Sequence, residues 1–355
     1  MAIKVLIVDD SALVRSLLSE IINDVPELEL VGAAPDAYVA RDMINQFTPD
    51  VITLDVEMPR MDGLSFLEKL MAARPTPVLM ISTLTEEGAD ATLRALELGA
   101  VDFLPKPRLG VASGIREYAE LIVEKIIAAS KVRVRARSSI KIAEEFQPKE
   151  KIKIQQIQST EKIIAMGAST GGTEAIKDLL MQFPAAVPGI VMTQHMPPGF
   201  TRTFAERLDK TTRLHVVEAR GGERILPGHA YLAPGGFHLV VARSGADYIV
   251  KLSDAEPVHR HRPAVDVMME SVARVGGKNV IGVLLTGMGK DGAQGMLDIR
   301  KQGGYTFAQD ADSCVVYGMP KEAVAIGGVD QSVELAKMGE AILAKLKFMG
   351  SGNRL

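Results

Sequence analysis

Short apolar runs alternate with amphipathic stretches over the first third of the chain, and this alternation restricts the possible folds more than any other feature. Strands are predicted at Val5–Val8, Leu30–Ala33, Val51–Leu54, Val78–Ile81 and Val101–Leu104. Helices are predicted at Leu13–Ile22, Val39–Phe47, Leu64–Ala73 and Thr92–Leu98, with Tyr118–Ala129 as a closing helix. Five strands that alternate with helices predict a parallel, doubly wound sheet.

A second α/β series begins at Ile163, after a stretch that is rich in charged residues and Gln and has no apolar face. We interpret residues 123–157 as a linker between a domain at 1–122 and a second domain at 158–350. Strands of the second domain are predicted at Ile163–Met166, Ile190–Thr193, Val216–Glu218, Val280–Leu285 and Tyr305–Ala308. The glycine-rich stretch 221–253 predicts an antiparallel hairpin added to this mostly parallel sheet, and Val333–Phe348 predicts a final helix.

Composition excludes several classes of protein. A length of 355 residues suits two domains, and 47% hydrophobic and 24% charged residues are ordinary for a globular protein. The net charge of −3 gives no indication of nucleic-acid binding, and no apolar run is long enough to insert into a membrane. A single cysteine, Cys314, permits no intrachain disulfide. We therefore expect a cytoplasmic protein.

Ionisable residues gather where the strands of the first domain end. The first strand is followed by Asp9 and Asp10, the third by Asp55, the fourth by Ser82–Thr83, and the fifth leads to Lys106–Pro107. Because parallel strands share one carboxyl edge, these side chains should converge there. Several carboxylates together suit Mg²⁺, and an aspartate beside the ion can form an acyl phosphate.

With these residues, the segment 1–122 resembles the response-regulator receiver family. The resemblance implies a flavodoxin-like fold. The motifs are the acid pair Asp9–Asp10, LDVEMPRMDG around Asp55, ISTL around Thr83, and FLPKP around Lys106. By resemblance Asp55 is the phosphorylation site.

The resemblance also implies the metal and switch positions of the receiver. Mg²⁺ is held by Asp10, Asp55 and the backbone of Glu57, next to Asp9. Thr83, Lys106 and the aromatic Phe103 are the switch residues, and the bond between Lys106 and Pro107 is expected to be cis.

Three residues of the second domain form a candidate hydrolytic site. Its first strand runs into Gly167–Gly172 (GASTGG), which fits the G-x-S-x-G pattern around Ser169. His195 ends the next strand, and Asp291 follows a later one. A serine needs a base, histidine can serve near neutral pH, and an aspartate can orient the histidine. Backbone amides near Ser169 and Gly287–Gly289 could bind the oxyanion.

Other interpretations of these motifs are open. Gly167–Gly172 could cradle phosphate, although neither the Rossmann nor the P-loop spacing is present. Asp266 could replace Asp291 as the acid, but its segment reads as an amphipathic helix. His259 and His261 could begin a metal site, which the neighbouring Arg260 and Arg262 oppose, so a role in binding an anion or a partner is favoured. Cys314 has no adjacent histidine and is interpreted as an inert thiol.

Taken together, GASTGG, TQHMPPGF and LTGMGKDGA behind a receiver resemble the chemotaxis-specific protein-glutamate methylesterases of bacteria. The resemblance implies a triad of Ser169, His195 and Asp291, with Thr170 beside the nucleophile and the amide of Met288 in the oxyanion loop. It implies hydrolysis of glutamate methyl esters on the cytoplasmic helices of membrane chemoreceptors, deamidation of certain receptor glutamines, and no cofactor in the catalytic domain. The implied phosphodonor is the chemotaxis histidine kinase.

The domain order suggests that the resting receiver covers the catalytic site and that phosphorylation loosens this contact. The alternative is a receiver-controlled, catalytically silent module that binds receptors. A DNA-binding regulator is a third possibility, which the absence of an evident recognition helix disfavours.

Overall fold

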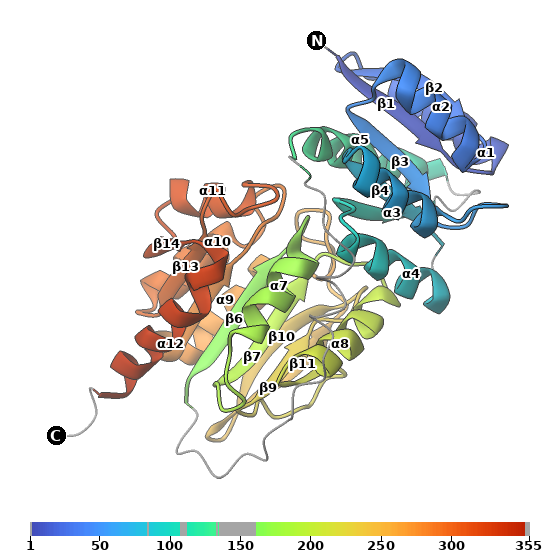
Figure 1. Ribbon diagram of the computed structural model, residues 1–355. Coiled ribbons are helices and arrows are strands. Elements are labelled where there is room, and N and C mark those ends of the chain that lie inside the picture. The colour runs from blue at the N-terminus through green and yellow to red at the C-terminus, as the bar shows by residue number, and fades with distance from the viewer. Residues whose placement is uncertain (1, 84, 107–111, 133, 135–160, 352–355) are drawn as a thin grey trace. The chain divides into compact units, whose positions relative to one another are not determined.

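The computed structural model describes residues 2–83, 85–106, 112–132, 134 and 161–351. The chain divides into two compact units, Met1–Glu145 and Phe146–Leu355, each with its own sheet (Figure 1). Among the described residues, no helix is both long and apolar enough to cross a membrane.

The N-terminal unit is a five-stranded parallel sheet in the order β2-β1-β3-β4-β5, as predicted. Its elements are β1 Ile3–Val8, α1 Ala12–Asn23, β2 Leu28–Ala34, α2 Ala37–Phe47, β3 Val51–Asp55, α3 Gly63–Ala73, β4 Val78–Ser82, α4 Glu86–Glu97, β5 Asp102–Pro105 and α5 Ala112–Ser130. The apolar residues of the inner strands β3 and β4 and of β1 from Val5 onward are almost completely buried, as expected of a sheet covered on both faces, whereas Leu30 and Val31 of the edge strand β2 are partly exposed.

Side-chain caps fix where the helices of this unit begin. Ser11, Asp36, Asp62 and Thr85 each stand just before a helix, and the side-chain oxygen of each accepts a backbone N–H of the first turn. Ser11 and Asp62 follow the acidic ends of β1 and β3 by a few residues. The caps therefore hold the loops that carry the acidic residues.

The C-terminal unit contains a parallel sheet with seven strands in the described residues, in the order β14-β13-β12-β6-β7-β9-β8. Its elements are β6 Ile163–Ala168, α7 Gly172–Met181, β7 Gly189–Gln194, α8 Phe200–Thr211, β8 His215–Glu218, β9 His229–Leu232, β10 His238–Ser244, β11 Asp247–Ser253, α9 Val265–Gly276, the 3₁₀ turn Gly277–Asn279, β12 Val280–Leu284, α10 Ala293–Lys301, β13 Tyr305–Gln309, α11 Met319–Ala325, β14 Gln331–Val333 and α12 Leu335–Ser351.

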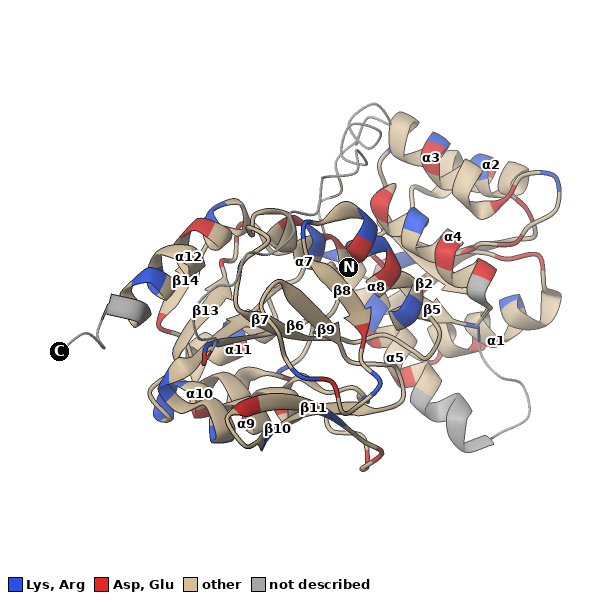
Figure 2. Cartoon of the chain, turned by 90° about the horizontal axis from the view of Figure 1, so that it is seen from below, with Lys and Arg blue, Asp and Glu red and all other residues tan. Residues whose placement is uncertain are grey.

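Two layers cover this sheet. Figure 2 shows α7, α8 and α12 on one side of the strands, and α9, α10 and the β10–β11 hairpin on the other. The second layer encloses an apolar core, which combines β6 and β12 residues with Met268, Met269 and Met296 and with hairpin residues such as Val241 and Val250. The hairpin thus occupies a position that a helix would take in a regular doubly wound fold. Acidic and basic residues both occur along the solvent-facing helices, as on α8 (Figure 2).

The hairpin was predicted correctly, but its attachment was not. We expected it to extend the main sheet, whereas β10 and β11 form a separate two-stranded antiparallel sheet. From the same stretch, β9 joins the main sheet as a parallel strand between β7 and β8. Alternation of apolar residues indicates a strand but does not select its partner, which the tertiary contacts decide. The strands β9 and β14 were not predicted.

The boundaries given above for the linker, residues 123–157, remain a prediction. Helix α5 continues to Ser130, because Ile122, Ile126 and Ala129 are buried against the N-terminal core, so residues 123–130 of the expected linker are helical. Of the remaining segment, residues 133 and 135–157 lie outside the described residues.

Gly167 of β6 packs closely against Val265, the first residue of α9. A Cβ at Gly167 would lie 2.2 Å from Cγ1 of Val265, too close for any real contact. We predict that Gly167→Ala lowers the free energy of unfolding by about 1–3 kcal/mol through overpacking. Urea denaturation would measure this. The double variant Gly167→Ala/Val265→Ala removes the obstructing methyl groups, so its loss in free energy of unfolding should be smaller than the sum of the losses in the two single variants. Strictly additive losses would contradict the contact.

Candidate functional sites

The acidic residues of the N-terminal unit meet at the carboxyl edge of its sheet, as predicted. Asp9, Asp10 and Asp55 each offer a carboxylate oxygen, and these atoms all lie within 4.8 Å of one another. Asp9 and Asp55 are buried and Asp10 is exposed. Lys106 Nζ lies 2.7 Å from Asp55 Oδ2 and 3.7 Å from Asp9 Oδ2. Three carboxylates therefore face one ammonium group.

Burial raises the pKa of Asp55 to about 6, and the charge of Asp9 acts in the same direction, although Lys106 and the Glu57 amide oppose the shift. Burial likewise raises the pKa of Asp9. Asp9 Oδ2 is buried and has no hydrogen-bond partner among the described residues. The cluster is therefore short of positive charge, and its hard oxygen ligands fit a divalent cation such as Mg²⁺.

The predicted switch residues lie on or just after β4 and β5, the strands next to β3 in this sheet. Thr83 Oγ1 donates a hydrogen bond to Glu57 Oε1 at 3.3 Å and lies 3.2 Å from Thr85 Oγ1. Phe103 is a buried residue of β5. The expected cis bond between Lys106 and Pro107 involves Pro107, which lies outside the described residues.

In the C-terminal unit, Ser169 lies on a sharp turn between β6 and α7. Gly171 adopts φ +76° and the amide of Gly172 donates to Ser169 O at 2.7 Å, which closes the turn. A Cβ at Gly172 would lie 2.2 Å from Oε1 of Gln194, so the close packing there requires glycine. The GASTGG sequence thus produces the strand–turn–helix geometry that the G-x-S-x-G pattern predicts.

Ser169, His195 and Asp291 come together as predicted. The chain reverses direction across the sheet between β6 and β12, and ligands of open α/β sheets bind at such switch points. Ser169 Oγ lies 3.1 Å from His195 Nδ1, and Asp291 Oδ2 lies 2.7 Å from His195 Nε2. The side chain of His195 is 5% exposed and that of Asp291 is 2% exposed, so the pair is shielded from water.

Asp291 fixes which ring nitrogen of the neutral histidine carries the proton. Burial alone would raise the pKa of Asp291, but the hydrogen bond and charge of His195, with the amides of Asp266 and Val265, outweigh burial and hold the pKa below its usual value. An ionised carboxylate only accepts hydrogen bonds, so the ring proton must be on His195 Nε2. Nδ1 is then free to accept the proton of Ser169.

Asp266, the alternative acid, does not contact His195. Its Oδ2 lies 3.0 Å from His259 Nε2, and its Oδ1 accepts the amide of Gly295 at 2.8 Å. Burial raises the pKa of Asp266, and the nearby charge of Asp291 adds to the shift. The geometry therefore favours Asp291 as the partner of the histidine.

The predicted oxyanion loop lies against the serine. A Cβ at Gly287 would lie 2.9 Å from Ser169 Cβ, so the loop that carries Met288 begins against Ser169. The Met288 amide donates no hydrogen bond to another described residue, whereas that of Ser169 donates to Thr286 O at 3.0 Å. Thr170 is buried next to the serine, and its carbonyl accepts from Thr286 Oγ1 at 3.0 Å. The Met288 amide is thus the better candidate donor.

Two supporting residues were not anticipated. Gln194 Nε2 donates to Ser169 O at 2.9 Å, and Thr286 Oγ1 links Thr170 O to the Val316 segment. Both stand inside motifs that the sequence had already indicated, TQHMPPGF and LTGMGKDGA. Their polar side chains next to the proposed catalytic residues were the available signal.

The two histidines of the predicted H-x-H pair and Cys314 do not form a common site. His259 pairs with Asp266, whereas the ring of His261 stacks on that of His195, so the two histidines do not face a common point. Burial raises the pKa of Cys314 to about 12, and Asp310 contributes, which agrees with an inert thiol.

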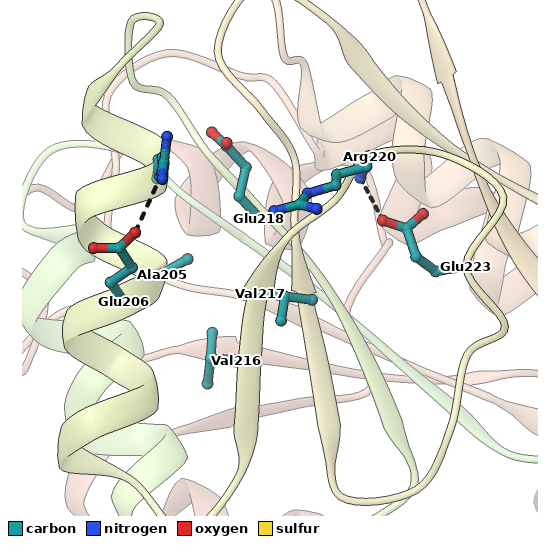
Figure 3. Close-up of a pocket in the computed structure, with 8 residues that line it drawn as sticks. Ala205, Glu206, Val216, Val217, Glu218, Arg220 and Glu223 are labelled. Carbon is teal, nitrogen blue, oxygen red and sulfur yellow. Dashed lines mark hydrogen bonds and ion pairs between the residues drawn. The ribbon is translucent and has the colours of Figure 1, made fainter.

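A groove of about 500 Å³ lies between α8, β8 and the loop that follows β8 (Figure 3). Its lining carries both signs of charge and consists of Arg202, Ala205, Glu206, Val216, Val217, Glu218, Arg220 and Glu223. None of the three proposed catalytic residues lines it, so this groove is separate from the site at the carboxyl edge.

Comparison with known proteins covers both units. Residues 5–110 match the response regulator receiver domain, and residues 164–342 match the CheB methylesterase family. A Pseudomonas aeruginosa protein named protein-glutamate methylesterase/protein-glutamine glutaminase 2 is 62% identical over 355 residues, which is 100% of both chains. A Cupriavidus pinatubonensis protein of the same name is 58% identical over 98% of this chain and 97% of its own.

A solved structure supports the assignment of the C-terminal unit. The crystal structure of the Thermotoga maritima CheB methylesterase catalytic domain matches with a TM-score of 0.51 and 38% identity, over 52% of this chain and 98% of that one. The chain belongs to the CheB methylesterase family and has a response regulator receiver domain before its methylesterase domain.

Proposed function

We propose that the chain hydrolyses methyl esters of glutamate side chains on chemoreceptors and deamidates receptor glutamines. The observation that carries the proposal is the position of His195 between the other two residues. Its Nδ1 lies 3.1 Å from Ser169 Oγ, and its Nε2 lies 2.7 Å from Asp291 Oδ2. The names of its relatives, protein-glutamate methylesterase/protein-glutamine glutaminase, supply the two substrates.

The proposed reaction is acyl transfer through the serine. His195 Nδ1 takes the proton of Ser169 as Oγ attacks the γ-carbonyl carbon, and the Met288 amide donates to the oxyanion. His195 then gives that proton to the departing methoxide. Methanol is released, and the glutamyl group remains bound to Ser169 as an acyl-enzyme. Water repeats the sequence with His195 as base, releases glutamate and restores Ser169. A glutamine substrate follows the same path and releases ammonia.

We propose that the N-terminal unit is the switch of this enzyme, with Asp55 as phosphoryl acceptor and the chemotaxis histidine kinase as donor. Asp10, Asp55 and the Glu57 backbone, next to Asp9, would hold Mg²⁺, which neutralises charge on the incoming phosphoryl group. Lys106, already paired with Asp55, and Thr83 would bind the phosphoryl oxygens. Phosphorylation would then relieve a restraint that the receiver imposes on the catalytic site.

Ser169→Ala should lower turnover by about 10⁴-fold or more while the fold survives, because the nucleophile is lost. The measurement is methanol release from receptor membranes that carry methyl-labelled glutamates. The same assay separates the enzyme from the alternative, a catalytically silent receptor-binding module, since only an enzyme releases methanol. An undiminished rate in the variant would exclude the serine mechanism.

Asp291→Asn should lower kcat by about 10³-fold or more, because the amide no longer favours the proton on His195 Nε2 or stabilises the imidazolium. The matched control is Asp266→Asn, which changes a neighbouring carboxyl that does not touch His195 and should cost less than about tenfold. Methanol release would measure both. The opposite ranking would assign the acid to Asp266.

Removal of residues 1–140 should raise the basal esterase rate above that of the unphosphorylated full chain. Asp55→Asn should hold the full chain at its basal rate when Mg²⁺ and a phosphodonor are supplied. Initial rates of methanol release would measure both variants. A truncated enzyme no faster than the unphosphorylated chain would mean that the receiver does not restrain the catalytic unit.

A further inference from the structure

A tight turn at Val258–His261 borders the proposed catalytic site. Val258 and His261 exchange two backbone hydrogen bonds of 2.9 and 3.0 Å, and the two residues between them, His259 and Arg260, have φ of +51° and +65°. Hairpin turns with two left-handed residues normally use glycine or asparagine there. Residues with side chains persist in this conformation only where surrounding contacts enforce it, often at functional sites.

Contacts on both sides hold this turn. His259 Nε2 lies 3.0 Å from Asp266 Oδ2, which ties the turn to the first residues of α9. Arg262 Nη1 donates to the carbonyls of Asp254 and Ala255 at 2.8 and 3.1 Å, which ties the turn to the segment that enters it. Since the Asp266 amide donates to Asp291 Oδ1 at 2.9 Å, the turn and the proposed triad share one anchor.

The turn delivers His261 to the face of His195. The two imidazole rings are stacked, with centroids 3.7 Å apart and planes 18° from parallel. The hydrogen bonds of His195 to Ser169 and Asp291 both act through its ring nitrogens. They define the direction of the ring edges but resist tilting of the ring plane only weakly. A stacked ring opposes that tilt directly.

We propose that His261 is a positioning residue, whose stacked ring holds His195 with Nδ1 toward Ser169 and Nε2 toward Asp291. The inference rests on the function proposed above, because it concerns the base of that reaction. His261 transfers no proton in this scheme. It keeps the base within reach of the nucleophile through acylation and deacylation, while His259 and Asp266 keep His261 in place.

Two substitutions in the full, phosphorylated chain test this role. His261→Leu fills similar space without a planar ring, and His261→Phe keeps a planar ring without nitrogen. In methanol release from methyl-labelled receptor membranes, we expect the Leu variant to lose about tenfold in kcat with KM almost unchanged. The Phe variant should stay within about threefold of the native kcat.

A second readout follows the ring itself. In ¹⁵N-histidine-labelled protein, the His195 signals, identified by their loss in His195→Gln, should report one tautomer in the native chain and in His261→Phe. In His261→Leu they should report a mixture. If the Leu variant does not fold, as judged by circular dichroism, His261→Gln takes its place.

The control is His229→Ala. His229 also lies beside other rings, with centroids 5.2 Å from His215 and 6.2 Å from Tyr231, but it begins β9, at the opposite edge of the sheet from Ser169. Its removal should leave kcat unchanged.

Three results would overturn the inference: native kcat in His261→Leu, a Phe variant as slow as the Leu variant, or a slow Leu variant whose His195 signals are native. These are distinguishable from failure of the proposed function. Native turnover in Ser169→Ala would reject the serine mechanism itself, whereas an inactive Ser169→Ala beside a fully active His261→Leu would reject only the role of His261.

Discussion

The carboxylate of Asp291 is the contact on which the catalytic unit depends. It accepts from His195 and from the amides of Val265 and Asp266, the first two residues of α9. The residue before α9 is Ala264, which has no side chain to cap the helix, so Asp291 supplies the cap from another loop. The helix dipole and the histidine together keep this buried carboxylate ionised. One group thus joins β12, α9 and the end of β7.

Asp55 in the receiver domain lies in surroundings with the opposite charge balance from those of Asp291. Asp291 is buried with enough donors to lower its pKa, whereas burial and the neighbouring Asp9 raise the pKa of Asp55 to about 6 although Lys106 is bonded to it. A site with surplus negative charge is completed by an added cation, while a site with balanced charge needs no addition. The two aspartates therefore lie in opposite electrostatic surroundings, which suit each to the different chemistry proposed for it.

Much of this could be predicted because strand ends are visible in a sequence. Parallel strands bring their carboxyl ends to one edge, so Asp9, Asp55 and Lys106 could be grouped without coordinates, and so could Ser169, His195 and Asp291. Contacts that depend on backbone turns could not be grouped. The stack of His261 on His195 requires left-handed residues at His259 and Arg260, which no local pattern indicates.

By itself the sequence determined two α/β units, the order of most strands along the chain, and which residues stand at the strand ends of each candidate site, because apolar periodicity and strand-end residues are local properties. Only the tertiary structure decided that the hairpin packs beside α9 as a separate sheet while β9 enters the main one, since strand partners are selected by packing. It also bears on the choice between Asp291 and Asp266. The helical pattern around Asp266 already favoured Asp291, and the 2.7 Å contact of Asp291 with His195 Nε2, against the pairing of Asp266 with His259, supports that choice.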